Sequence, residues 1–157
     1  MNIITLNIIC GLPGSGKTTL GRRLCGNNCV SADDYFYDID GEYNFNPALL
    51  PLAHGECQTR VRQKLLNAID LLDHGICYEV RDVAVANTFT QAWEVDPYRK
   101  IVADLQPIAA EAGVEIRIVR IDLFDADCAD EELAVRTKHG VPVEAIARMR
   151  ARYEFSK

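Results

Sequence analysis

One motif near the N-terminus constrains the fold of this chain most strongly. Gly11-Leu12-Pro13-Gly14-Ser15-Gly16-Lys17-Thr18 matches the spacing G-x-x-x-x-G-K-[ST] at every fixed position. The apolar, β-branched residues 3–10 precede it and residues 17–25 have helical character, so the motif is predicted to join a buried strand to a helix. In that setting, glycines let backbone N–H groups surround a phosphate, and the helix dipole presents its positive end to the same anion.

The motif assigns a role to each of its residues. The predicted nucleotide-binding residues are Gly11, Pro13, Gly14, Ser15, Gly16, Lys17, Thr18 and Thr19. Lys17 is expected to reach the β- and γ-phosphates, and the Thr18 hydroxyl is expected to hold Mg²⁺. ATP and Mg²⁺ are therefore the predicted cofactors. The alternative is a chance glycine-rich turn with a solvated lysine, which the flanking strand and helix disfavour.

Strand and helix patterns alternate along the rest of the chain. Further strands are predicted at 29–31, 77–86 and 114–121, and further helices at 47–73, 97–112, 130–138 and 142–153, with an acidic and aromatic loop at 35–45. Such alternation is typical of a parallel sheet covered by helices on both faces. The sequence therefore predicts a three-layer α/β fold of the P-loop NTPase type, forming a single domain over residues 1–157.

Charge and cysteine content narrow the possible partners. The chain has 17 basic and 23 acidic residues, a net charge of −6, so nonspecific binding to nucleic acid through the whole surface is disfavoured. Its apolar runs are shorter than the roughly 20 residues that cross a bilayer, so no membrane partner is expected. The six cysteines form no C-x-x-C pair and are predicted to be reduced, mostly buried thiols. A cytoplasmic location is expected.

Two adjacent acidic residues follow the predicted strand at 29–31. Asp33 and Asp34 would lie at the carboxyl edge of the sheet, where open α/β folds bind their ligands. Phosphoryl transfer needs a group that positions or deprotonates the acceptor hydroxyl. One of the two carboxylates is predicted to do this, and the alternative is that one of them caps a turn or helix.

A basic turn separates the last two predicted helices. It contains Arg136, Lys138 and His139, at the place where small kinases carry a mobile lid that closes over the phosphates. From the residues alone, the simpler interpretation of Arg136 is an ion pair with Glu132 four residues earlier. His139 is predicted to be a turn residue rather than a catalytic one.

The motifs together resemble a known family. They are residues 11–19, Ser31-Ala32-Asp33-Asp34-Tyr35-Phe36, Tyr43-Asn44-Phe45-Asn46-Pro47, Asn87-Thr88-Phe89, Trp93-Glu94, Pro97-Tyr98, residues 136–142, Arg148-Met149 and Arg152-Tyr153. Their order is similar to that in the small P-loop kinases grouped with phage polynucleotide 5′-hydroxyl kinase and the kinase-like domain of NEDD4-binding proteins. The resemblance covers nearly the whole chain.

The resemblance implies specific catalytic residues. Asp33 corresponds to the general base, and Arg136 to the cationic residue of a helical lid at about residues 126–142. Family members usually have an aspartate before the Asn-Thr loop, where this chain has Ala86. The resemblance implies that this aspartate helps to orient the lid arginine or the metal. In this chain either Asp82 or an acid from another element takes that role, or the lid is held differently.

The implied activity is ATP-dependent phosphorylation of a hydroxyl on nucleic acid, with DNA favoured over RNA. The acceptor is either a 5′-hydroxyl end or a 5-hydroxymethyluracil base extruded from phage DNA, which would place the protein in the host cytoplasm. Candidate substrate contacts are Asp34, Tyr35, Asn87 and Arg148. One alternative is a small-molecule kinase acting on a nucleoside, sugar or nucleotide-sugar, which the acidic surface would suit. The other is a catalytically decayed nucleotide-binding protein, which Ala86 would explain. No oligomeric state follows from the sequence.

Overall fold

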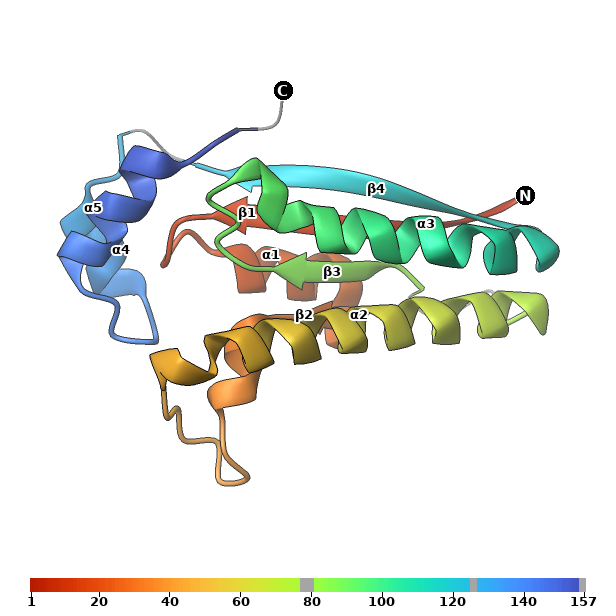
Figure 1. Cartoon of the computed structure of the whole chain (residues 1–157), viewed down its shortest axis with the longest axis horizontal. Coiled ribbons are helices and arrows are strands. Elements are labelled where there is room, and N and C mark those ends of the chain that lie inside the picture. The colour runs from red at the N-terminus through yellow and green to blue at the C-terminus, as the bar shows by residue number, and fades with distance from the viewer. Residues whose placement is uncertain (77–80, 125–126, 156–157) are drawn as a thin grey trace.

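The computed structural model describes residues 1–76, 81–124 and 127–155 of the chain. Its centre is a parallel sheet of four described strands, β1 (Asn2–Gly11), β2 (Cys29–Val30), β3 (Val83–Ala86) and β4 (Val114–Leu123), in the order β2-β3-β1-β4 (Figure 1). Because the strands are parallel, their carboxyl ends meet at one edge of the sheet, which is where the glycine-rich motif follows β1.

β1 is a central strand because nearly all of its side chains are apolar. Ile4, Leu6, Ile8 and Ile9 are fully buried, on both faces of the sheet. The strand pairs with β3 from Leu6↔Val83 to Ile9↔Ala86 and with β4 along its whole length. A strand covered on both faces needs such a continuous apolar sequence, and the motif therefore follows a buried strand that is paired on both sides.

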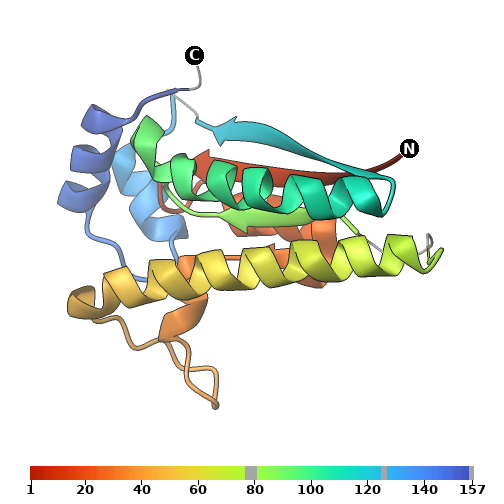
Figure 2. The same cartoon turned by 45° about the vertical axis from the view of Figure 1, so that its right-hand side comes forward.

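Helices cover both faces of the sheet (Figures 1 and 2). α1 (Lys17–Cys25) packs on one face, and α2 (Leu50–Asp73) and α3 (Asp96–Glu111) pack on the other. Asn46 starts the long helical segment, because its side chain accepts a hydrogen bond from the backbone N–H of Ala48 at 3.0 Å. The predicted three-layer α/β fold is confirmed.

Two short helices lie beyond the carboxyl edge of the sheet (Figure 1). They are α4 (Asp130–Arg136) and α5 (Val143–Arg152). Leu133 and Ile146 from these helices form a small apolar cluster with Leu12 of the glycine-rich motif. An ion pair of 2.7 Å between Arg150 and Asp130 links the two helices. The C-terminal helices thus rest directly on the loop that follows β1.

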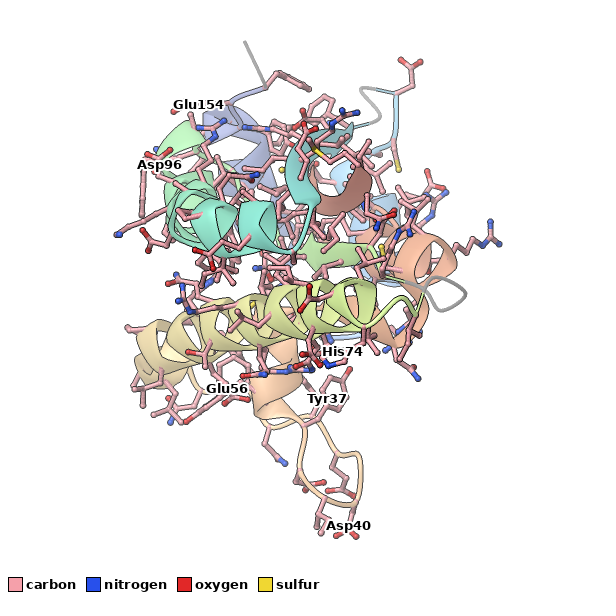
Figure 3. All side chains as sticks on the ribbon, turned by 90° about the vertical axis from the view of Figure 1, so that its right-hand side faces the viewer. Tyr37, Asp40, Glu56, His74, Asp96 and Glu154 are labelled. Carbon is pink, nitrogen blue, oxygen red and sulfur yellow. The ribbon has the colours of Figure 1, made fainter. Side chains whose placement is uncertain are left out.

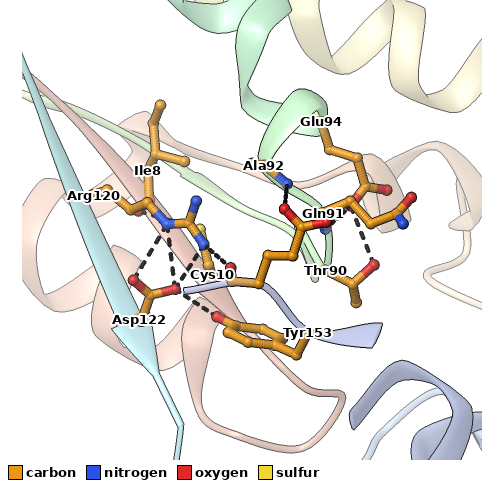
Figure 4. Close-up of polar contacts among 10 residues, drawn as sticks. Ile8, Cys10, Thr90, Gln91, Ala92, Glu94, Arg120, Asp122 and Tyr153 are labelled. Carbon is orange, nitrogen blue, oxygen red and sulfur yellow. Dashed lines mark hydrogen bonds and ion pairs between the residues drawn. The ribbon is translucent and has the colours of Figure 1, made fainter. Parts of the chain in front are cut away.

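The end of α5 is tied to the sheet by polar contacts (Figure 4). The Tyr153 hydroxyl donates to Asp122 of β4 at 2.7 Å, and Asp122 also pairs with Arg120 at 3.0 Å. The guanidinium of Arg120 donates to the carbonyl oxygen of Glu154 at 2.6 Å, and the N–H of Glu154 donates to the carbonyl of Thr90 at 2.7 Å. These contacts anchor one end of the helical pair and leave the α4–α5 turn at the other.

The predicted elements agree with the structure except at some boundaries. The strand predicted at 77–86 is present only as β3 (Val83–Ala86), and residues 77–80 of that prediction lie outside the described chain. The helix predicted at 130–138 ends at Arg136. The segment predicted as a loop at 35–45 begins with part of a 3₁₀ turn (Ala32–Phe36) and contains an antiparallel bridge between Tyr37 and Tyr43. It projects from the body of the molecule, with Tyr37 at its base and Asp40 at its tip (Figure 3).

The cysteines agree with the prediction of reduced, mostly buried thiols. Cys10, Cys25 and Cys57 are free and buried, Cys29 is free and half-buried, Cys128 is buried, and Cys77 lies outside the described residues. Burial raises the pKa of the Cys10 thiol to about 12. In the part of the chain that the structure describes, no helix has both the length and the apolar character needed to cross a bilayer.

Candidate active site

The glycine-rich loop has the backbone geometry of a phosphate-binding loop. Gly14 and Gly16 have φ angles of 78° and 90°, a region that side chains other than glycine rarely adopt. A Cβ atom at Gly14 would lie 2.5 Å from the carbonyl oxygen of Leu133. α4 therefore packs against the loop so closely that only glycine fits at this position.

Polar groups of the loop fit a triphosphate. The hydroxyl oxygen of Ser15 is buried and has no hydrogen-bond partner among the described residues, which is unusual for a buried polar atom. The described first turn of α1 contains no acidic residue, so the positive end of its dipole is not neutralised there. Phosphate oxygens would supply the acceptors that both features lack.

Lys17 is the first residue of α1, and its side chain reaches back to the loop. Its ammonium group donates to the carbonyl oxygen of Leu12 at 2.8 Å. Burial lowers the pKa of Lys17 to about 8, and the negative charge of Asp33 acts on this pKa in the opposite direction. The loop lysine and the first aspartate of the Asp33-Asp34 pair are therefore close enough to interact electrostatically.

Thr18 and Thr19 are exposed at the start of α1. Among the described residues no cluster of three His, Cys, Asp or Glu side chains is arranged to hold a metal ion. Mg²⁺ usually binds through few protein ligands together with substrate phosphates. The residue that would hold Mg²⁺ here is Thr18, together with the phosphates of a bound nucleotide.

A cavity of about 300 Å³ adjoins the loop. It lies between the loop, the end of β4 and the C-terminal helices, and its lining residues are Leu12, Ser15, Asp122, Leu123, Phe124, Cys128, Leu133 and Arg136. The orphaned hydroxyl of Ser15 therefore borders a space that α4 covers.

The structure separates the roles of the two adjacent aspartates. Asp34 accepts a hydrogen bond from the backbone N–H of Ser31 at 3.0 Å and pairs with Arg60 of α2 at 2.9 Å. Its carboxylate thus closes a capping box on the 3₁₀ turn Ala32–Phe36. The alternative that one carboxylate caps a turn is confirmed, and it applies to Asp34.

The carboxylate of Asp33 lies on the solvent-accessible side of the same turn. One carboxylate oxygen accepts from the Tyr43 hydroxyl at 3.1 Å, and the other lies 3.3 Å from Nδ1 of His139. The side chain is 44% exposed, so an acceptor molecule can reach it from solvent. Burial and the charge of Asp33 raise the pKa of Tyr43, which remains a hydrogen-bond donor to the carboxylate.

Asn87 holds the aspartate turn from behind. The side-chain oxygen of Asn87 accepts from the backbone N–H of Ala32 at 2.9 Å, and the backbone N–H of Asn87 donates to the carbonyl of Ile9 near the end of β1. Asn87 is buried, so any contribution to a substrate site is through the position of the turn.

The other predicted substrate residues lie in different surroundings. Tyr35 is half-buried and packs edge-on against Phe36 with ring centroids 5.5 Å apart. Arg148 is exposed on α5.

Arg136 starts beside the loop but is paired with Glu132. Its Cβ atom would lie 3.3 Å from a Cβ atom at Gly14, so the side chain leaves the helix next to the loop. The guanidinium forms an i, i+4 ion pair with Glu132 and is 55% exposed. Contact between Arg136 and a phosphate would require it to leave this partner.

Asp82 does not replace the family aspartate that is absent at Ala86. Asp82 accepts from the backbone N–H of Thr5 at 2.8 Å, before the start of β3 and thus near the opposite edge of the sheet from the loop. That hypothesis is wrong, because a side chain at the amino end of a parallel strand cannot reach ligands at its carboxyl end. The acid from another element that borders the cavity is Asp122, next to Cys10 in the sheet register.

The sequence reasoning missed the position of His139. It contacts Asp33 and also stacks on Tyr43, with ring centroids 4.2 Å apart. The turn between α4 and α5 thereby reaches the aspartate turn. No local pattern indicates this contact, because His139 and Asp33 are far apart in the sequence.

The chain is similar in sequence to known proteins over nearly its whole length. A family model described as an AAA domain matches residues 6–156. Human NEDD4-binding protein 2 is 33% identical over 155 residues, which are 96% of this chain but only 8% of the length of that relative. A crystal structure described as a fungal RNA kinase shares 13% identity at a TM-score of 0.43, over 98% of this chain and 67% of that one. The match of the family model over almost the whole length shows that the chain belongs to the family of P-loop proteins described as AAA domain.

Proposed function

We propose that this protein is a Mg²⁺- and ATP-dependent kinase that transfers the γ-phosphate to a hydroxyl on nucleic acid. The observation that carries the proposal is the position of Asp33. It is a half-exposed carboxylate at the carboxyl edge of the sheet, within electrostatic reach of Lys17, while Asp34 takes the structural duties of the turn. This arrangement supplies a candidate base beside a candidate phosphate site.

The loop residues bind and orient the nucleotide in this mechanism. Lys17 leaves the carbonyl of Leu12 and binds the β- and γ-phosphates, and the Ser15 hydroxyl gains an acceptor. The Thr18 hydroxyl would hold Mg²⁺, which would supply neutralisation of the phosphate charge when bound. The packing of α4 on Gly14 covers one side of the loop.

Asp33 removes the proton of the acceptor. The acceptor hydroxyl gives its proton to the carboxylate while its oxygen forms a bond to the γ-phosphorus. The bond from the γ-phosphorus to the bridging oxygen breaks, and ADP leaves with that oxygen. Arg136, released from Glu132, stabilises the charge on the transferring group.

The aromatic loop and the family motifs support nucleic acid as the acceptor. Tyr43 contacts Asp33, and Tyr37 and Phe45 pack against the Tyr43 ring; aromatic rings commonly stack on unpaired bases. DNA is proposed over RNA, with either a 5′-hydroxyl end or an internal 5-hydroxymethyluracil as the acceptor. An extruded base would meet the same rings.

Transfer of label from γ-³²P-ATP in the presence of Mg²⁺ tests the proposal. The acceptors are a 5′-hydroxyl DNA oligonucleotide, its RNA counterpart, end-blocked DNA with an internal 5-hydroxymethyluracil, and a mixture of nucleosides and sugars. Lys17→Ala is the control and should abolish transfer to every acceptor. Label on a nucleic acid is the expected result, and its position identifies the acceptor hydroxyl.

Two outcomes would contradict the proposal. Label on the small molecules alone would make this a nucleoside or sugar kinase. ATP binding without transfer to any acceptor would indicate a decayed enzyme.

A further inference from the structure

The ring of His139 covers one face of Tyr43 beside Asp33. The two rings are nearly parallel, at 19°, with centroids 4.2 Å apart. Nδ1 of His139 lies 3.3 Å from a carboxylate oxygen of Asp33, and Nε2 lies 3.0 Å from the hydroxyl oxygen of Tyr37. A planar nitrogen heterocycle is thus held by stacking on one face and by polar contacts at two ring nitrogens. Proteins recognise unpaired nucleobases by the same combination.

Tyr43 keeps its position through contacts other than those with His139. Its hydroxyl donates to Asp33, and its ring packs against Phe36 at 6.1 Å and against Tyr37 at 5.2 Å. An isolated antiparallel bridge between Tyr37 and Tyr43 joins the backbone on the two sides of this loop. The face of Tyr43 is therefore a preformed platform that does not depend on the α4–α5 turn.

His139 is attached to the rest of the molecule more weakly. It lies in the turn between α4 and α5, followed by Gly140 with a φ of 64°, and Lys138 and Gly140 on either side are exposed. Its contact with Asp33 is partly open to solvent, where ion pairs contribute little. α4 and α5 are anchored by Leu133, by Arg150 and by the contacts at Glu154, so this turn can withdraw while the two helices stay in place.

Docking of His139 and binding of the acceptor exclude each other. The carboxylate oxygen that Nδ1 of His139 approaches belongs to the residue that receives the acceptor proton in the proposed function. An acceptor hydroxyl that approaches this oxygen along the His139-covered face of Tyr43 must displace the imidazole. The ring next to that hydroxyl then lies over the uncovered face of Tyr43.

We propose that the face of Tyr43 covered by His139 is the subsite for a nucleobase of the acceptor, and that His139 is a displaceable occupant of this subsite. The role of this subsite in phosphate transfer rests on the proposed function, whereas the binding of a nucleobase to Tyr43 does not. It makes Tyr43 a residue that selects acceptors with an aromatic ring near the reacting hydroxyl. It also makes His139 an internal competitor of the acceptor.

Binding of a fluorescent base measures the subsite without any transfer. The probes are a short single-stranded 5′-hydroxyl DNA with 2-aminopurine as the first base, the same strand with 2-aminopurine in the middle, and 2-aminopurine riboside. Stacking on Tyr43 should change their emission, and titration gives the dissociation constant in the absence of ATP. A preference for the first probe indicates end recognition, and a preference for the second indicates an internal base. Riboside binding alone indicates a nucleoside acceptor.

Substitutions in the turn and in the platform should have opposite effects. His139→Ala should tighten probe binding by at least about threefold, because the competitor is gone. Tyr43→Leu should weaken it by at least about tenfold, while Tyr43→Phe keeps the stacking face and should stay within about twofold. His139→Trp places a larger ring on the turn and should weaken binding. Val135→Ala, on the exposed face of α4, is the control and should change nothing.

Three results would overturn the inference. One is weaker probe binding in His139→Ala, which would make His139 itself the binding residue. Another is unchanged binding in a folded Tyr43→Leu variant, and the third is no emission change with any probe. If label transfer occurs but Tyr43→Leu binds normally, the subsite is wrong and the proposed function stands. If the probes bind as described but no acceptor takes label, the subsite stands and the proposed function fails.

Discussion

Replacement of Asp34 should destabilise the protein, whereas the same replacement of its neighbour Asp33 should not. Asp34→Ala removes the acceptor for the Ser31 N–H, a capping bond worth about 0.5–2 kcal/mol. It also removes the ion pair with Arg60, whose partners are 34% and 39% exposed, so this pair adds at most about 1 kcal/mol. The expected loss in the free energy of unfolding is about 1–2 kcal/mol, or roughly 3–6 °C in Tm for a chain of this size.

Thermal unfolding followed by circular dichroism measures this difference. Asp33→Ala is the matched control, because its carboxylate is 44% exposed and its contacts among the described residues are with the side chains of Tyr43 and His139. Its free energy of unfolding should change by no more than about 0.5 kcal/mol. An equal or larger loss in Asp33→Ala than in Asp34→Ala would refute the division of roles between the two aspartates.

Three further predictions concern Lys17 in the phosphate-binding loop, Arg136 of α4, and Asn87 behind the aspartate turn. Because burial lowers the pKa of Lys17 to about 8, ATP affinity should fall about tenfold between pH 7 and pH 9 as Lys17 loses its proton. The Lys17→Ala variant should bind ATP weakly and without this pH dependence. Binding of a fluorescent ATP analogue at each pH checks both results. Arg136→Ala should lower kcat by about a hundredfold with little effect on ATP binding, whereas Glu132→Ala, which releases Arg136, should not lower kcat. Steady-state kinetics of both variants measure this, and an equal loss of kcat in the two would contradict it. Asn87→Ala leaves the Ala32 N–H without its acceptor, so it should cost about 1–3 kcal/mol of unfolding free energy and also lower kcat, as measured by thermal unfolding and by the transfer assay.

The sequence predicted the elements whose signals are local. The strand at 3–10, the glycine-rich motif and the helix from Lys17 to Cys25 carry apolar periodicity and fixed glycine spacing, and the structure contains all three. The long helix ending at Asp73 was likewise predicted by its apolar face and by His74-Gly75. These features depend on neighbours within a few turns of chain, so they can be recognised without the tertiary structure.

The division of roles at the candidate site could not be predicted in the same way. Asp33 and Asp34 are chemically identical, and their difference arises because Arg60 of α2 and the Ser31 N–H face only Asp34. The contact between His139 and Asp33 likewise requires that the α4–α5 turn folds back over the sheet edge. Such contacts join segments distant in sequence, which periodicity and spacing do not encode.

At position 86 the chain departs from its family, because Ala86 stands where family members usually have an aspartate. The resemblance pointed to Asp82 as a substitute, yet strand direction places Asp82 beside Thr5, away from the phosphate loop. Position along a parallel strand decides which edge of the sheet a side chain reaches. The sequence alone did not locate the start of β3 at Val83.

The most direct test of the account is the single-turnover rate of γ-phosphate transfer in Asp33→Asn, with ATP affinity measured in parallel. The assay uses saturating ATP and Mg²⁺ and whichever acceptor takes label from the wild-type protein. If Asp33 is the base, the rate should fall by a factor of about 10²–10⁴ while the dissociation constant for ATP stays unchanged. Transfer at the wild-type rate would contradict the central claim that this carboxylate activates the acceptor hydroxyl.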